Sequence, residues 1–275
     1  MGLLLTLLYQ AFGKSNGELN MRYLAMIQAR YGSSRMPGKI LMSLCGKPVL
    51  QRVIERVQRS KNIDEVIVVT SVDKQNLPVL RLCADLGVQV FAGAEDDVLD
   101  RYYQMAKLVR PDYVVRVTAD CPCYDWSILD RAIESMPPEA NYLTDFGETL
   151  PDGLDIEIIK FSALKTAWQK ANLASEREHV TQYIRKHPEE FQHKNFVCPF
   201  GDLGYLRWTL DEQEDFTLIE KIYSHFLSMG REDFLTQDIL EFIGENPELR
   251  KINARYARNE GLAKSLREDK IVEQL

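Results

Sequence analysis

The sequence predicts an α/β fold with a mostly parallel sheet. Short apolar runs alternate along the chain with segments in which apolar residues recur at helical spacing. The runs Glu65–Thr70 and Tyr113–Val117 are rich in β-branched residues, which is typical of strands buried on both faces. The chain has 275 residues, of which 45% are hydrophobic and 27% charged, so it can form one large soluble domain. Strands that alternate with helices at this spacing imply right-handed crossover connections.

The first half of the chain divides readily into such elements. An apolar run at 23–28 is followed by helical spacing from Pro48, a residue that suits a first helical turn. Gly87 stands where a helix would end. The expected elements are, in order, a strand over 23–28, a helix over 48–59, a strand over 65–70, a helix over 75–86, a strand over 88–91, a helix over 97–109, a strand over 113–117 and a helix from Trp126.

The second half is less regular. We expect strands over Leu154–Ile159 and Tyr205–Thr209. The expected helices cover 162–172, 176–187, 214–227 and 234–243.

Three regions follow from this division. Residues 1–20 are expected to be an extension outside the fold, because the apolar stretch 2–12 is too short to span a bilayer and lacks a positively charged flank. Residues 21–245 are expected to form the main domain, which carries the chemistry. Residues 246–275 are expected to form a helical C-terminal tail.

Charge and cysteine content disfavour several classes of protein. The chain has 41 acidic against 34 basic residues, a net charge of -7, and no basic helix, which argues against a nucleic-acid binder. Five scattered cysteines imply no disulfide framework, so a reducing cytoplasm fits best. Zinc ligation by Cys121 and Cys123 is disfavoured, because they are too closely spaced and no second pair exists.

The most informative segment is the loop over 28–39, directly after the first expected strand. It combines the cations Arg30, Arg35 and Lys39 with Gly32, Ser33, Ser34 and Gly38. Glycines let backbone N–H groups approach an oxyanion closely, and the cations neutralise its charge. The order of residues matches neither a P-loop nor a dinucleotide fingerprint. We therefore expect a dedicated pocket for a polyphosphate.

A second loop, over 118–125, follows another expected strand and so belongs to the same, ligand-binding edge of the sheet. Asp125 is the better cap for the helix from Trp126, which leaves Asp120 free to bind Mg²⁺. Asp211 follows the expected strand 205–209 and could supply a second carboxylate, although acidic residues also favour helix N-termini in general. Arg116, inside a strand, is expected to reach an anion or an acidic partner.

Two further clusters are candidates for substrate contacts. Asp155 and Glu157 alternate on one face of an expected strand, where they could hold sugar hydroxyls, a second metal or a partner subunit. Arg177 and His179 are candidates for contacting an acidic substrate. Ser175 and Glu178 have the spacing of a capping box. Arg101, near the start of a helix, could face a nucleotide or solvent.

Several of these segments together resemble a known family, the sugar-acid cytidylyltransferases that make CMP-ketodeoxyoctulosonate and CMP-sialic acids. Within that superfamily, the fuller set of segments looks like the spore-coat polysaccharide SpsF branch. The resemblance covers nearly everything from Met21 to the C-terminus. The segments that carry it are Gln28–Lys39, Gly46–Pro48, Glu95–Tyr102, Arg116–Pro122, Pro151–Glu157, Ser175–Val180 and Arg207–Asp211.

This resemblance implies a Rossmann-like, three-layer nucleotidyltransferase (GT-A-like) fold with a mostly parallel mixed sheet. It implies Mg²⁺-dependent transfer of CMP from CTP to a small acidic sugar, for polysaccharide or glycan biosynthesis, by a homodimer. Asp120 and Asp211 fall where the family holds its metal, although the family's Gly-Asp-Glu-Pro has become Ala-Asp-Cys-Pro here. Glu178 and His179 fall near the sugar acid. The residues implied to bind the nucleotide are Ala29, Arg30, Gly32, Ser33, Arg35, Lys39, Arg101 and Thr118.

The expected reaction is attack of an acceptor hydroxyl on the α-phosphorus of CTP, with Lys39 and Arg35 stabilising the departing pyrophosphate. Three alternatives remain open. The acceptor could be a sugar phosphate or phosphonate, or the nucleotide could differ. A GT-A-type glycosyltransferase is possible, but Ala119-Asp-Cys lacks its Asp-x-Asp motif. A silent nucleotide sensor is disfavoured, because Lys39 and both aspartates are present.

Overall fold

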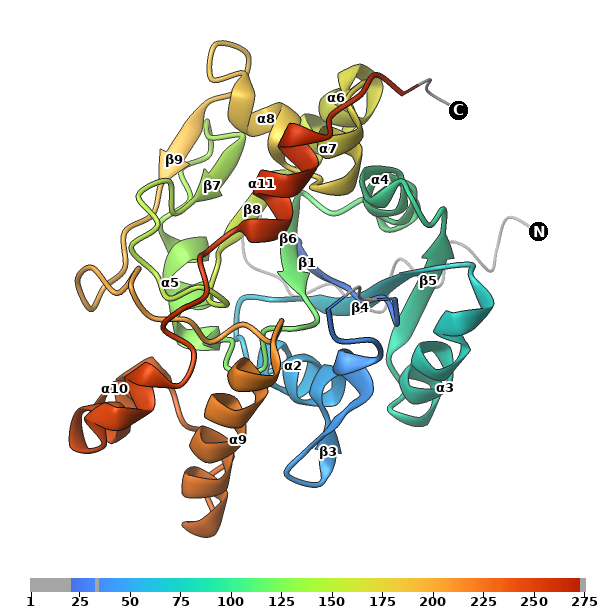
Figure 1. Ribbon diagram of the computed structural model, residues 1–275. Helices are drawn as coiled ribbons and strands as arrows, with labels where there is room; N and C mark the ends of the chain where they lie inside the picture. Colours follow the sequence, from blue (N-terminus) through green and yellow to red (C-terminus); the bar gives the residue numbers. More distant parts are fainter. Residues whose placement is uncertain (1–20, 33–34, 273–275) are drawn as a thin grey trace, which may run out of the picture.

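The structure is a computed structural model that describes residues 21–32 and 35–272. A seven-stranded sheet of order β5-β4-β1-β6-β8-β7-β9 runs through its centre, with helices on both faces (Figure 1). The expectations for residues 1–20 and for Ser33 lie outside the described residues. The strands of this sheet are β1 (Tyr23–Gln28), β4 (Glu65–Ser71), β5 (Gln89–Gly93), β6 (Tyr113–Thr118), β7 (Tyr142–Thr144), β8 (Glu157–Lys160) and β9 (His193–Asn195).

The sheet is parallel on one side and mixed on the other. Strand β1 pairs in parallel with β4 and with β6, and β4 pairs in parallel with β5. Strand β8 runs antiparallel to both β6 and β7, and β7 pairs in parallel with β9. A small antiparallel hairpin, β2 (Ser43–Leu44) and β3 (Lys47–Pro48), lies beside this sheet. The expected α/β class and mostly parallel mixed sheet are therefore confirmed.

Helices cover both faces of the sheet and make a three-layer fold. The side chains of β1 alternate between two buried clusters, since successive residues of a strand point to opposite faces. Ala25 and Ile27 pack in the cluster that includes α2, α3, α5 and α9, whereas Leu24 and Met26 pack in the cluster that includes α4, α6 and α8. The helices are α2 (Val49–Val57), α3 (Leu77–Asp85), α4 (Val98–Val109), α5 (Trp126–Glu134), α6 (Phe161–Lys170), α7 (Ala174–Glu178), α8 (Gln182–Lys186), α9 (Gln213–Ser228), α10 (Thr236–Glu245) and α11 (Glu260–Arg267), with 3-10 turns η1 (Lys39–Leu41), η2 (Lys74–Asn76) and η3 (Pro247–Lys251).

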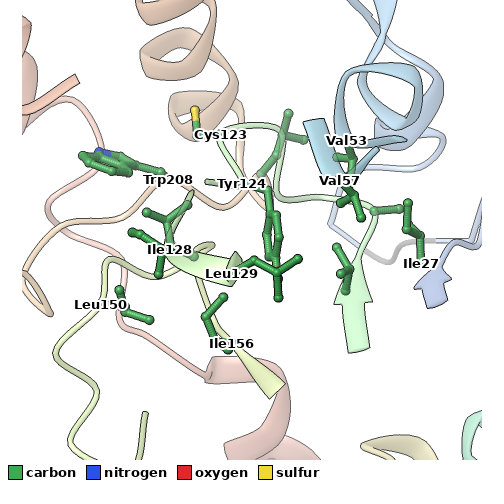
Figure 2. Packing of buried hydrophobic residues seen from close by; sticks show 14 of the residues in the cluster. Ile27, Val53, Val57, Cys123, Tyr124, Ile128, Leu129, Leu150, Ile156 and Trp208 are labelled. Carbon is green, nitrogen blue, oxygen red and sulfur yellow. The ribbon is translucent and has the colours of Figure 1, made fainter. Parts of the chain in front are cut away.

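The larger buried cluster supports the loops at the carboxyl end of the sheet. Figure 2 shows Val53 and Val57 of α2 beside Ile27 of β1. Tyr124, in the loop after β6, packs in the same cluster and is 1% exposed. Burial of these apolar side chains stabilises the fold by roughly 1.5–3 kcal/mol each. The loop that carries Asp120 is thus held by the core on one side.

Two expected elements of the second half differ in the structure. The helix expected over 176–187 is two short helices, α7 and α8, because Val180 between them has a φ of 54° in the left-handed region. The strand expected over 205–209 is an extended segment with one isolated bridge, from Arg207 to Asp152. The short strands β7 and β9 were not predicted, because three residues give too little pattern.

The capping box expected from Ser175 and Glu178 is wrong. The Ser175 hydroxyl donates instead to Asp269, at 2.7 Å, and Glu178 accepts from the Ser265 hydroxyl, at 2.9 Å. The carboxylate of Glu176 accepts the free N–H groups at the start of α7, including that of Leu173 at 3.4 Å. Contacts with the C-terminal tail, which no local pattern contains, decide this arrangement.

Candidate functional site

Lys39 joins two aspartates that are far apart in the sequence. Its Nζ donates to Asp120 at 2.6 Å and to Asp211 at 2.7 Å. Lys39 begins η1, Asp120 follows β6, and Asp211 lies two residues before α9. Burial opposes charge on both partners, but Lys39 lowers the pKa of Asp120 to about 2, and the two carboxylates raise the pKa of Lys39. Lys39 and Asp120 are therefore both charged at neutral pH.

Asp211 is held by two further cations. Arg35 lies 2.9 Å from its carboxylate and also pairs with Glu212 and Glu260, at 3.4 and 3.1 Å. Arg207 reaches the same carboxylate at 3.3 Å. The loop 35–39 thus faces the aspartates, as expected.

Arg207 is the buried hub behind this site. It pairs with Asp152 at 2.6 Å and with Asp215 at 2.9 Å, in addition to Asp211. Asp215 is fully buried and accepts the backbone N–H groups of Asp211 and Glu212, at 3.0 and 2.9 Å. The position of the Asp211 carboxylate is therefore fixed by its own backbone as well as by salt bridges.

Two cavities meet at the aspartate pair. A cavity of about 890 Å³ lies on the side of loop 28–40, and one of about 280 Å³ lies on the other side. Both are lined by Arg35, Thr118, Asp120 and Asp211. A reaction between two bound molecules could take place where these cavities join.

Most residues implied to bind the nucleotide line the larger cavity. Arg30, Gly32, Arg35, Lys39 and Thr118 are among them. A smaller cavity of about 120 Å³, which also contains Arg30, is lined by Ala29 and Arg101. The Arg101 guanidinium is buried and donates to the carbonyl oxygens of residues 94 and 95, at 2.6 and 3.0 Å. Arg101 thus forms part of the wall of the 120 Å³ cavity, and its guanidinium is already hydrogen-bonded to backbone carbonyl oxygens.

Only some of the residues expected to contact the second substrate line a cavity. Asp155, Glu157 and His179 line the 280 Å³ cavity. Glu157 is buried and paired with Arg116, and it accepts hydrogen bonds from the hydroxyls of Tyr142 and Thr181. Arg116 therefore reaches an acidic partner, as the sequence indicated.

Arg177 is absent from the linings of both cavities. It is buried, its Nε donates to Asp97 at 2.9 Å, and its Nη1 donates to the carbonyl oxygen of Trp168 at 2.8 Å. These contacts tie α7 to α4 and α6. In this arrangement Arg177 supports the fold and is not placed to contact a substrate in the 280 Å³ cavity.

The sequence did not reveal several residues that line the 280 Å³ cavity, hereafter called the smaller cavity. Arg185 lines it, packs over the Phe146 ring at 5.2 Å, and has no carboxylate within 4 Å among residues 21–32 and 35–272. Asp145 Oδ1 and the Tyr124 hydroxyl are buried there without a hydrogen-bond partner in the described chain. His179 Nε2 is also buried without a hydrogen-bond partner in the described chain, because the nearest carboxylate, that of Glu178, lies 3.7 Å away. Asp145 was missed because it follows β7, a strand the sequence did not reveal.

Asp152 also lines the smaller cavity and has an unusual titration. Burial, and then repulsion by Asp155, raises its pKa to about 7, although Arg207 opposes the shift. Its Oδ2 accepts from Arg207, and Arg207 also contacts Asp211. A carboxyl group that titrates near neutral pH therefore lies close to the aspartate pair.

Asp120 and Asp211 are the two carboxylates at the junction that could hold a magnesium ion, and in this structure Lys39 Nζ contacts both of them. Mg²⁺ in nucleotide enzymes is commonly bound through one or two carboxylates and the substrate phosphates, with water completing its coordination. Asp120 and Asp211 provide that number of carboxylates. Over the part of the chain that the structure describes, no group of three or more His, Cys, Asp or Glu side chains is disposed to hold a metal by itself. Any ion here would need phosphate oxygens or water to complete its coordination.

Comparisons with known proteins identify the family. Residues 24–250 match the family described as cytidylyltransferase. The chain is 32% identical over 240 residues to the spore coat polysaccharide biosynthesis protein SpsF of Bacillus subtilis, covering 82% of this chain and 95% of that one. A solved cytidylyltransferase from Leptospira borgpetersenii has a TM-score of 0.80 at 31% identity, with 86% of this chain and 100% of that chain covered.

A partial similarity adds a second group of relatives. The chain is 37% identical over 120 residues to 3-deoxy-manno-octulosonate cytidylyltransferase of Anaeromyxobacter dehalogenans, which covers 42% of this chain and 48% of that protein. Within residues 21–32 and 35–272, no helix is long and apolar enough to cross a membrane.

Proposed function

This chain belongs to the cytidylyltransferase family and is a CTP-dependent nucleotidyltransferase, and we propose that it transfers CMP to a hydroxyl of a small sugar acid with release of pyrophosphate. The observation that carries the proposal is the convergence of Lys39, Asp120 and Asp211 where the two cavities join. The proposal assigns CTP to the larger cavity and the acceptor to the smaller one. The proposal also takes the protein to be a homodimer, as the family resemblance implies, and to lie in the cytoplasm, as the cysteine pattern implies.

The larger cavity suits a nucleoside triphosphate. Arg30, Arg35 and Lys39 face it, and Gly32 adds backbone with no side chain in the way. The adjoining small cavity, formed around Ala29 and Arg101, is offered for the base. Phosphates placed beside Arg35 and Lys39 would lie next to Asp120 and Asp211, which would hold Mg²⁺ there. When bound, the ion would neutralise the charge of the phosphates.

The smaller cavity suits an acceptor with one anionic group and several hydroxyls. Arg35 and Arg116 are already paired with carboxylates, whereas Arg185 is not. The Arg185 guanidinium, whose only hydrogen bond within the described part of the chain is to the Tyr142 hydroxyl at 3.4 Å, matches one carboxylate, with which it can form a bidentate contact. Asp145, Tyr124 and His179 each present a buried polar atom without a partner in the described chain, and such atoms are satisfied by ligand hydroxyls. The acidic walls disfavour a dianionic phosphate.

The proposed reaction needs little covalent work from the protein. The acceptor oxygen forms a bond to the α-phosphorus, and the bond to the bridging oxygen of the β-phosphate breaks, so that pyrophosphate leaves. Lys39 and Arg35 stabilise the negative charge that develops on the leaving group. Asp152 lines the acceptor cavity and accepts the hydroxyl proton. Arg207 positions both Asp152 and Asp211.

The test is pyrophosphate release from each of the four ribonucleoside triphosphates, with sugar acids, sugar phosphates and phosphonates as acceptors. We expect release with CTP only, and only when a sugar acid is present. A preference for a phosphorylated acceptor would overturn the assignment of the acceptor. Release that requires no acceptor, or none with any nucleotide, would overturn the reaction itself.

A further inference from the structure

The outer wall of the larger cavity comes from the C-terminal tail. Residues of α11, among them Lys264, Ser265 and Arg267, line this cavity together with Arg30 and Lys39 from the loop after β1. Figure 1 shows α11 (red) beside α7, in front of the central strands, and contacts between α11 and α7 place the two helices together. The cavity is therefore enclosed between segments from the two ends of the fold.

Helix α11 is fixed at both ends and, between them, by the hydrogen bond from Ser265 to Glu178 at 2.9 Å. None of its side chains is buried. Before the helix, Arg258 pairs with Asp155 at 2.5 Å. After it, Asp269 accepts from the Ser175 hydroxyl at 2.7 Å, and Ile271 bridges to Leu173. These anchors hold the helix over the cavity, although none of its side chains is buried.

The charges on α11 divide into two groups. Lys264 and Arg267 line the cavity, are exposed, and have no carboxylate within 4 Å among the residues the structure describes. Glu260, at the start of the helix, instead pairs with Arg35 at 3.1 Å. The tail thus offers two unpaired cations and, just after the helix, the carboxylate of Glu268 to the cavity, while Glu260 neutralises a cation of the opposite wall.

We propose that α11 is part of the nucleotide site, where Lys264 and Arg267 bind the β- and γ-phosphates and Glu260 competes with those phosphates for Arg35. This inference rests on the proposed function, because it takes the larger cavity to be the nucleotide site. The charge of the opposite wall supports it. Lys39 is shared by two aspartates and Arg35 by three carboxylates, so Arg30 alone among the loop's cations lacks a close partner, its carboxylates lying 3.9–4.0 Å away. A triphosphate carries far more charge than one arginine can neutralise.

The experiment measures the dissociation constants of CTP and CMP by calorimetry with the full chain. The double variant Lys264→Gln/Arg267→Gln should bind CTP about tenfold more weakly, since two charge-assisted contacts at an exposed site are lost. CMP lacks the β- and γ-phosphates, so its binding should change less than twofold. Glu260→Gln should bind CTP about threefold more tightly, because Arg35 loses one of the three carboxylates that compete with the phosphates.

A matched control keeps the charge change and moves it away from the cavity. Arg250→Gln/Lys251→Gln, on the exposed surface of η3, should bind CTP as the unchanged chain does. Unaltered CTP binding in the double variant of α11 would overturn the proposal, as would an equal loss for CMP. Equal or weaker CTP binding in Glu260→Gln would overturn the competition for Arg35. If the unchanged chain fails to bind CTP at all, the proposed function fails, which is a separate result.

Discussion

The two cavities differ in charge and in how their walls are built. The larger cavity, which we propose for CTP, is formed by the loop after β1 and by α11, and five cations and five carboxylates line it. The acceptor side is formed by short, irregular segments after β7, β8 and α7, and carboxylates predominate. A regular frame therefore holds the half of the site that we propose for CTP. The irregular half is where a family can change its acceptor without altering the frame.

Breaking the group that both cavities share should have the largest effect. Asp120→Ala or Lys39→Ala should lower kcat by about a thousandfold or more, because charge at the transition state is no longer neutralised. Pyrophosphate release in single turnovers would measure this. Asp96→Ala, on an exposed residue outside both cavities, is the control. Near-normal rates in either of the first two variants would show that the chemistry takes place elsewhere.

The next largest effect should separate the two cavities. Arg185→Gln should raise KM for the acceptor by about a hundredfold, since a bidentate charged contact is lost, and leave the dissociation constant of CTP unchanged. Steady-state kinetics and calorimetry test the two halves. Arg81→Gln, on the exposed surface of α3, should change neither. Weaker CTP binding in Arg185→Gln would contradict the division of the site.

Arg177→Gln sharpens the same comparison, because Arg177 is near Arg185 in sequence but outside both cavities. Its loss leaves Asp97 without its partner and should lower the free energy of unfolding by about 2 kcal/mol. Denaturant unfolding measures this change. KM for the acceptor should stay within about twofold of the original value. A large increase in KM for the acceptor, with an unchanged free energy of unfolding, would show that Arg177 contacts the substrate.

The smallest effect concerns pH on the acceptor side. The pKa of Asp152 is raised to about 7, so its carboxylate loses the ability to accept a proton as the pH falls through that value. We expect kcat to fall about tenfold per unit below pH 7, while CTP binding stays constant over the same range. Asp152→Asn should be slow and should lose this dependence. A flat profile in the unchanged chain would exclude Asp152 as the proton acceptor.

The sequence predicts the parallel strands beside the larger cavity well because its information there is local. Strand β1 matches the expected strand residue for residue, and Lys39 was recognised from one continuous loop. The role that we propose for Arg185 was hidden, because it depends on which neighbouring cations already have partners. The break at Val180 was hidden too, since no residue type there demands a left-handed conformation. Pairings between distant segments, such as Ser175 with Asp269, have no signal in local pattern.

The lack of buried side chains in α11 has a consequence for how the protein would lose activity on heating. Segments with few apolar contacts open locally at a free energy far below that of global unfolding. Arg35 and Glu260, which are 225 residues apart in the chain, meet only while this segment is docked. Mild heating or limited proteolysis should therefore abolish activity while the central sheet is still folded. Inactivation would precede melting, and amide exchange in residues 258–268 would report it first.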